Sequence, residues 1–169
     1  MDVMEAIKTR RSIRKYQDKQ IDENVLHELL EAGFCAPSAM NFRPVHFVVV
    51  KEKLQLANIS ACGMFTKMIK NAACCIIIVG DCRKQLIHDL LVNDCSAAIE
   101  NILLAAHGLG LGAVWCGVPE KRGLDKKLKV LLELPERMKV MGLISIGYPD
   151  EVKKNQERYE ESKIHHEKW

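Results

Sequence analysis

The stretch GLGLGAVWCG, residues 108–117, decides which fold class this chain can adopt. It follows apolar residues at helical spacing over residues 85–109, and it leads into a strand-like run over residues 113–116. The glycines are spaced G-x-G-x-G and stand after a helix. A dinucleotide-binding fingerprint is spaced G-x-G-x-x-G and stands between a strand and the helix that follows it. The sequence therefore predicts a helix C-cap and a sharp turn here instead of a Rossmann phosphate loop.

Outside this stretch, helical and strand patterns alternate along the chain. Asp22 is predicted to cap a second helix that ends near Gly33, because Pro37 cannot continue it. Residues 61–70 fit neither pattern clearly. Further helices are predicted over residues 2–9, 52–59, 85–109 and 125–132, and strands over residues 45–50, 74–79, 113–116 and 139–146. This alternation indicates an α+β or α/β protein and leaves the strand order open.

Composition limits the classes of function. The 169 residues indicate one domain, and the net charge of +3, with basic and acidic residues interleaved, argues against nucleic acid as a partner. The longest apolar run, residues 72–79, is far shorter than the ~20 residues of a membrane-spanning helix. The acidic first residues argue against a signal peptide. Seven cysteines without a C-x-x-C pair argue against a disulfide framework or a metal site, and they fit a reducing, cytoplasmic location.

The first segment with chemical character is RRSIRK, residues 10–15. Arg10, Arg11 and Arg14 supply guanidinium groups, and Ser12 adds a hydroxyl group. Both kinds of group are suited to bind a phosphate, because they donate hydrogen bonds and the guanidinium groups carry positive charge. A solvated basic surface is the alternative interpretation of such a run.

The second segment is APSAMNFRP, residues 36–44, in which two prolines fix a loop between a helix and a strand. Ser38 and Asn41 place short polar side chains on this loop. They are suited to the edge of a heteroaromatic ring, where donors and acceptors alternate. Ordinary turn chemistry is the alternative, because Pro, Ser and Asn are frequent in turns.

The last segment, residues 151–169, differs in composition from the rest of the chain. It is mostly charged, with Tyr159, Ile164 and Trp169 as isolated apolar residues. A disordered tail is one interpretation. The other is an arm that docks on a partner chain. The terminal Trp favours the arm, because a chain end stays ordered only when it is tied down.

Taken in order, these motifs resemble those of the nitroreductase family. The matching patterns are R-R-S-x-R at residues 10–14, A-P-S-x-x-N-x-x-P at residues 36–44, G-L-G at residues 108–110, W-x-G at residues 115–117 and G-Y-P at residues 147–149. The resemblance implies one α+β domain over residues 1–169, with a nitroreductase-like fold in which helices flank a central, mainly antiparallel sheet. It also implies an intertwined homodimer that holds FMN at the subunit interface, with residues 151–169 as an arm on the partner.

The resemblance also implies which residues bind the cofactor. They are Arg10, Arg11, Ser12 and Arg14 at the ribityl phosphate; Pro37, Ser38, Ala39 and Asn41 from the other subunit; Trp115, Cys116 and Gly117 along the N5 edge of the flavin; and Arg158 at the phosphate, with Lys154 as its rival. A cation near N1 and O2 of the flavin is expected from Arg14 or from Lys67. Many members carry Gln where this chain has Arg43, which leaves the choice of substrate open.

The implied reaction is electron transfer from NADH or NADPH through FMN to a small acceptor, such as a nitroaromatic or a quinone, by ping-pong exchange at one site. FMN carries the redox chemistry, so neither a catalytic side chain nor a metal is expected. Cys116 is expected to line the site passively, and His165 and His166 are expected on the surface. The alternatives are reductive dehalogenation or flavin destruction on the same fold, and flavin binding without catalysis.

Overall fold

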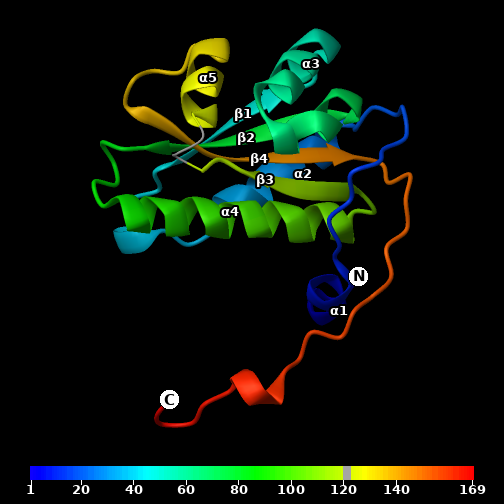
Figure 1. Ribbon diagram of the computed structural model, residues 1–169, viewed down its shortest axis with the longest axis vertical. Coiled ribbons are helices and arrows are strands. Elements are labelled where there is room, and N and C mark those ends of the chain that lie inside the picture. The colour runs from blue at the N-terminus through cyan, green and yellow to red at the C-terminus, as the bar shows by residue number, and fades with distance from the viewer. Residues whose placement is uncertain (120–122) are drawn as a thin grey trace.

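The computed structural model describes residues 1–119 and 123–169, and a four-stranded antiparallel sheet forms its centre (Figure 1). The strands are β1 (Val45–Val50), β2 (Cys74–Asp81), β3 (Gly112–Gly117) and β4 (Met138–Gly147), in the order β1-β2-β4-β3. Each neighbouring pair of strands runs antiparallel. The expected α+β class with an antiparallel central sheet is therefore confirmed.

Two layers of helices cover the sheet (Figure 1). One face carries α2 (Glu23–Phe34) and α4 (His88–Gly108), and the opposite face carries α3 (Lys53–Cys62), the 3-10 helix η2 (Met64–Asn71) and α5 (Leu124–Leu131). The predicted cap of α2 is present, because the side chain of Asp22 accepts a hydrogen bond from the N–H of Asn24. Within the described part of the chain, no helix combines the length and the apolar run that crossing a bilayer requires.

The strand β2 separates two hydrophobic cores. All of its residues are buried. Successive side chains of a strand point to opposite faces, so Ile76 and Ile78 pack toward α2 and α4, while Ile77 and Val79 pack toward α3 and α5. Burial on both faces explains why the sequence shows a continuous apolar run at this strand instead of an alternating one.

The turn after α4 has the predicted cap. The N–H of Leu111 donates a hydrogen bond to the carbonyl oxygen of Ala106 at 2.8 Å, and the N–H of Gly110 donates to that of His107 at 3.1 Å. Gly110 has a φ of +77°, a left-handed conformation that carries no steric penalty for glycine. The chain reverses here and begins β3, so these glycines form a cap and a turn, as predicted.

The structure differs from the sequence prediction most at two places, while the other element ends shift by at most two residues. The helix α4 begins at His88 instead of residue 85, because Asp81 holds the preceding residues in a turn through a 2.9 Å hydrogen bond from the N–H of Arg83. Residues 61–70, which fitted neither pattern, complete α3 and form most of η2. The buried hydroxyl of Thr66 donates to backbone carbonyls of α3 and of the turn after it. These hydrogen bonds lie at the break between the two helices.

Both ends of the chain lie outside the layered body (Figure 1). The first helix, α1 (Val3–Thr9), packs against the end of α4. The C-terminal segment leaves β4, passes α1 and extends away from the sheet, with a short 3-10 helix, η4 (Glu161–Lys163), near its end. Residues 152–169 are exposed throughout. The expected exposure of His165 and His166 is confirmed.

Candidate functional site

The basic segment lies along the free edge of β3. Ser12 forms a parallel bridge with Ala113, and the N–H of Ile13 donates to the carbonyl oxygen of Ala113 at 3.0 Å. Gly112 permits this approach, because a Cβ atom at that position would lie 2.6 Å from Cγ2 of Ile13. Two motifs that are about one hundred residues apart in the sequence are therefore side by side in the fold.

A second set of contacts fixes the far end of this segment. The Tyr16 hydroxyl donates to the carbonyl oxygens of Ile13, at 2.7 Å, and Ser145, at 3.1 Å. The Glu151 carboxylate accepts a hydrogen bond from the N–H of Arg14 at 2.6 Å. The segment is thus held between β3 on one side and the chain that follows β4 on the other.

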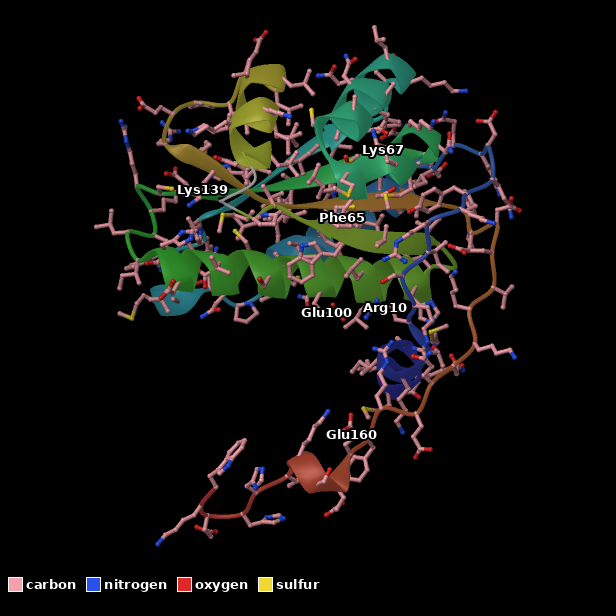
Figure 2. The ribbon with its side chains drawn as sticks, viewed as in Figure 1. Arg10, Phe65, Lys67, Glu100, Lys139 and Glu160 are labelled. Atoms are coloured by element: carbon pink, nitrogen blue, oxygen red, sulfur yellow. The ribbon has the colours of Figure 1, made fainter. Side chains whose placement is uncertain are left out.

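Arg10 and Arg11 have incompletely satisfied guanidinium groups. Nε of Arg10 lies 3.3 Å from Oε1 of Glu100, at ion-pair distance (Figure 2). That contact lacks hydrogen-bond geometry, and Nε of Arg10 and Nη2 of Arg11 are buried nitrogen atoms without a hydrogen-bond partner among the described residues. Arg11 uses its other nitrogens to donate to backbone carbonyls of Lys8, Arg10 and Lys154. A buried donor without an acceptor is costly, so the two arginines are suited to an anionic ligand.

His107 adds no positive charge to this cluster at neutral pH. Its Nε2 lies 2.8 Å from the Thr9 hydroxyl. Partial burial, followed by the repulsion of the Arg10 and Arg11 charges, lowers the pKa of His107 below its ordinary value of 6.5. The positive charge on this side of the site therefore comes from arginine.

A cavity of about 540 Å³ opens beside β3 and brings together four of the predicted site residues. Trp115, Cys116 and Gly117 line it from the strand, and Arg14 lines it from the basic segment. A Cβ atom at Gly117 would meet no protein atom within 4 Å, so the space beside this backbone is open to a ligand. The remaining lining residues are Met64, Phe65, Met68, Val114 and Pro119.

Sequence reasoning missed the wall that η2 contributes to this cavity. Met64 and Phe65 are exposed, and Met68 is partly buried with its sulfur 3.9 Å from Sγ of Cys116. Exposed large apolar side chains at a cavity mouth are typical of binding sites. The available signal was the spacing of apolar residues at 64, 65, 68 and 69, which lay in the stretch without a clear pattern.

Cys116 lines the cavity with a buried thiol. Its side chain is buried, and burial raises the pKa of its thiol to about 11, although the nearby Arg14 charge acts in the opposite direction. The thiolate is the reactive form of cysteine, so a thiol with this pKa stays protonated at neutral pH. This supports the passive role expected from the sequence.

The loop with Pro37, Ser38, Ala39 and Asn41 lies elsewhere in the chain. It forms the 3-10 helix η1 (Ala39–Asn41) and is attached to α4 by a 2.8 Å hydrogen bond from the N–H of Ala39 to Oδ1 of Asp94. The basic segment contacts α4 at Glu100 through Arg10, which is about 9 Å further along the helix axis at 1.5 Å per residue. None of the loop residues lines the cavity beside Trp115 in the described structure. One chain alone therefore does not bring this loop to the cavity.

The C-terminal segment carries both candidate cations, Lys154 and Arg158, past α1. The carbonyl oxygen of Lys154 accepts a hydrogen bond from Nε of Arg11 at 3.2 Å. Arg158 lines a hollow of about 600 Å³ between the tail and α1, together with Lys8 and Thr9. Lys67 is exposed on η2 (Figure 2) and is not among the described lining residues of the cavity beside β3, whereas Arg14 is.

Comparison with known proteins agrees with the motifs and with the fold. The model of the nitroreductase family matches residues 7–73 and 61–148. A Methanothermobacter thermautotrophicus protein assigned as an NADH dehydrogenase/NAD(P)H nitroreductase is 43% identical over 169 residues, which cover 100% of this chain and 88% of that protein. The chain belongs to the nitroreductase family, as its motifs indicate.

Solved structures show the same fold. An FMN-dependent nitroreductase from Clostridium difficile superposes with a TM-score of 0.91 at 35% identity, over 98% of this chain and 99% of that one. A Desulfovibrio desulfuricans protein, assigned as a nitroreductase and solved in complex with FMN, superposes with a TM-score of 0.86 at 28% identity, over 100% of this chain and 98% of that one. The nitroreductase-like fold expected from the sequence is confirmed.

Proposed function

We propose that this chain is an FMN-dependent oxidoreductase that takes electrons from NADH or NADPH and passes them to a nitroaromatic, a quinone or a similar small acceptor. The observation that carries the proposal is the cavity that joins Arg14 to Trp115, Cys116 and Gly117, with the incompletely satisfied Arg10 and Arg11 a few residues before Arg14 in the same segment. Relatives named as FMN-dependent or NAD(P)H-dependent nitroreductases support it.

The basic segment suits the phosphate end of FMN. The unpartnered nitrogen atoms of Arg10 and Arg11 are buried donors that an anion would satisfy. Ser12 itself forms the bridge to Ala113, so its position is fixed by the edge of β3. A terminal phosphate with a charge of about −1.5 to −2 matches such a cluster. These three residues, together with Arg14, are the proposed phosphate-side contacts.

The strand β3 suits the flat end of FMN. Gly117 leaves its backbone accessible, and Trp115 and Cys116 precede it on the same wall of the cavity. Bound FMN would supply the exchange of electrons with the nicotinamide and with the acceptor. The chain itself binds and orients the cofactor, and Arg14 brings a positive charge to the same cavity. No step of this proposal assigns an acid or a base to a side chain.

The complete site requires a second copy of the chain. The cavity beside β3 is lined, in the described structure, by none of Pro37, Ser38, Ala39 and Asn41, so in the proposed homodimer these residues face the flavin of the other subunit. Residues 151–169 form the proposed arm. Tyr159 and Trp169 of this segment are 68% and 100% exposed, which leaves apolar surface for a partner to cover.

The proposed location is the cytoplasm. All seven cysteines are free thiols, and most of them are buried or partly buried within the two cores and their edges. Free thiols persist in a reducing compartment. The proposed exchange of electrons there is ping-pong, with the nicotinamide and the acceptor using one site in turn.

The identity of the cofactor is tested directly by purifying the full chain, saturating it with flavin, removing the excess and identifying the flavin that stays bound. We expect a yellow protein that releases FMN on denaturation. FAD is not expected, because the phosphate-binding arginines suit a terminal phosphate and the glycine-rich turn after α4 offers no site for the second phosphate of a dinucleotide. Retention of FAD as the main flavin would contradict the assignment of the phosphate site.

A further inference from the structure

The loop that follows α2 has an unusual backbone. Met40, Asn41 and Arg43 have φ values of 53°, 55° and 50°, so three non-glycine residues within four positions are left-handed. A left-handed backbone at a residue with a side chain raises the free energy of the folded chain. Such a conformation persists only where surrounding contacts determine it. Such strain is common at ligand-binding sites.

Two polar side chains hold this loop. Oδ1 of Asp94 accepts the hydrogen bond from Ala39, and the hydroxyl oxygen of Ser38 accepts one from the N–H of Arg43 at 2.9 Å. Asp94 is only 4% exposed, and its Oδ2 has no hydrogen-bond partner among the described residues. Asp94, Ser38 and Arg43 line the same hollow of about 40 Å³ beneath the loop. The buried carboxylate of Asp94 therefore ties the loop to α4 through its hydrogen bond with Ala39.

The side chain of Asn41 has a defined orientation. Nε of Arg43 lies 3.0 Å from Oδ1 of Asn41. Because a guanidinium group has only donors, the Asn41 atom that faces it must be the acceptor oxygen. The amide nitrogen of Asn41 is therefore directed away from Arg43, and the exposed side chain presents two N–H donors.

We propose that Arg43 is a positioning residue that fixes Asn41 as a hydrogen-bond donor to a carbonyl oxygen of the isoalloxazine ring held by the partner copy. The proposal rests on the proposed function, in which this loop faces the flavin of the other subunit. It gives a role to Arg43, which the proposed function leaves without one. A Gln side chain also offers an N–H donor, so it can hold the Asn41 oxygen in the same way without a charge.

The double-mutant cycle of Arg43 and Asn41 tests this directly. The full-length variants Arg43→Leu, Asn41→Ala and the double variant are titrated with FMN by flavin fluorescence. Leu and Arg are both unbranched at Cβ, so the backbone penalty at φ 50° is similar. We expect Arg43→Leu to weaken FMN binding roughly three- to tenfold, the range for one neutral hydrogen bond. In the Asn41→Ala background, the same change should have no further effect.

The reduction potential of the bound flavin separates positioning from charge. A donor to a ring carbonyl stabilises the electron-rich reduced flavin, so Arg43→Leu should lower the midpoint potential. Arg43→Gln removes the charge and keeps the donor. Its FMN affinity and midpoint potential should therefore stay close to those of the wild type. Arg83→Leu, at an exposed arginine outside the loop, is the matched control, and it should change neither value.

Three outcomes would overturn the proposal. The first is an Arg43→Leu variant that binds FMN as tightly as the wild type. The second is a double variant whose loss equals the product of the two single losses, because Arg43 would then act independently of Asn41. The third is an Arg43→Gln variant that behaves like Arg43→Leu. A wild-type protein that retains no FMN would overturn this inference and the proposed function together, and this result is distinguishable from the other three.

Discussion

The carboxylate of Glu151 accepts a hydrogen bond from the backbone N–H of Arg14 at 2.6 Å, which joins the start of the C-terminal segment to the basic segment. The ammonium group of Lys153 lies 2.6 Å from the other oxygen of the same carboxylate. The hydrogen bond from Lys153, followed by that from Arg14, holds the pKa of Glu151 below its ordinary value of 4.5. Because Arg14 lines the cavity beside β3, Glu151 couples the path of the tail to the geometry of the site.

The lowered pKa of Glu151 predicts how its contribution to stability depends on pH. A carboxyl group whose pKa is depressed by folding stabilises the protein above its unfolded pKa, here 4.5, and the stabilisation is lost as the pH falls through the folded value. We expect Glu151→Gln to reduce the free energy of unfolding at neutral pH. The difference from wild type should shrink as the pH falls below 4.5 and the wild-type carboxylate is protonated. Denaturant titrations across pH measure this, with Glu28→Gln, an exposed glutamate on α2, as the control. A difference that does not change with pH would contradict the assignment.

Substitution of the basic segment should weaken FMN retention without unfolding the chain. Arg10→Ala and Ser12→Ala each remove a donor to the phosphate, and loss of a hydrogen bond to a charged group costs about 1.5–3 kcal/mol, or roughly ten- to a hundredfold in affinity. The measurement is the FMN dissociation constant, with thermal unfolding of the same samples. Arg83→Ala is a control for the loss of an exposed arginine. If Arg10→Ala holds FMN as tightly as the wild type, the phosphate assignment is wrong.

Cys116 should be dispensable for electron transfer. Its thiol has a pKa of about 11 because it is buried, so a reactive thiolate is scarce at neutral pH. We expect Cys116→Ala to lose some thermal stability, since the change leaves a small cavity next to Met68, and to keep the rate of flavin reduction within a few-fold of wild type. Stopped-flow reduction of the FMN-loaded variant decides this. A variant that binds FMN normally but is not reduced would show that the thiol takes part in the reaction.

Truncation before Lys154 should lower both dimer stability and flavin content. It removes Arg158 and the exposed apolar residues of the tail, and interfaces of obligate dimers usually bury roughly 2,000 Å² or more, an area that a docked arm helps to reach. Light scattering and absorbance on the truncated protein measure the two effects. Arg158→Ala in the full chain separates the charge from the arm, because it should reduce flavin content and leave the dimer intact. A truncated protein that remains a dimer saturated with FMN would rule out the arm.

Local sequence patterns predicted the elements and several parts of the site. The glycine spacing predicted the cap at Gly110, because a left-handed residue after a helix leaves a local signature. The density of arginines predicted an anion-binding segment, and two buried guanidinium nitrogens without partners support it. The antiparallel order of the strands was expected only through the resemblance to the family, since local patterns carry no information on strand order.

The contacts that complete the site link residues far apart in the sequence, and no local pattern reveals them. Glu151 and Arg14 are 137 positions apart, and Ala39 and Asp94 are 55 positions apart. The wall formed by Met64 and Phe65 was missed for the same reason. The apolar residues of η2 recur at helical spacing, but only the fold shows that the exposed ones lie across from β3.

The central claim is that the chain binds FMN and exchanges electrons with a nicotinamide and a small acceptor at one site. The most direct measurement is anaerobic titration of the FMN-loaded full chain with NADH and with NADPH, followed by addition of a quinone or a nitroaromatic. We expect the oxidised-flavin absorbance to disappear with at least one nicotinamide and to return with the acceptor, and steady-state rates to give the parallel double-reciprocal lines of ping-pong exchange. A flavin that stays oxidised with both nicotinamides would contradict the account and would favour a protein that binds flavin without catalysis.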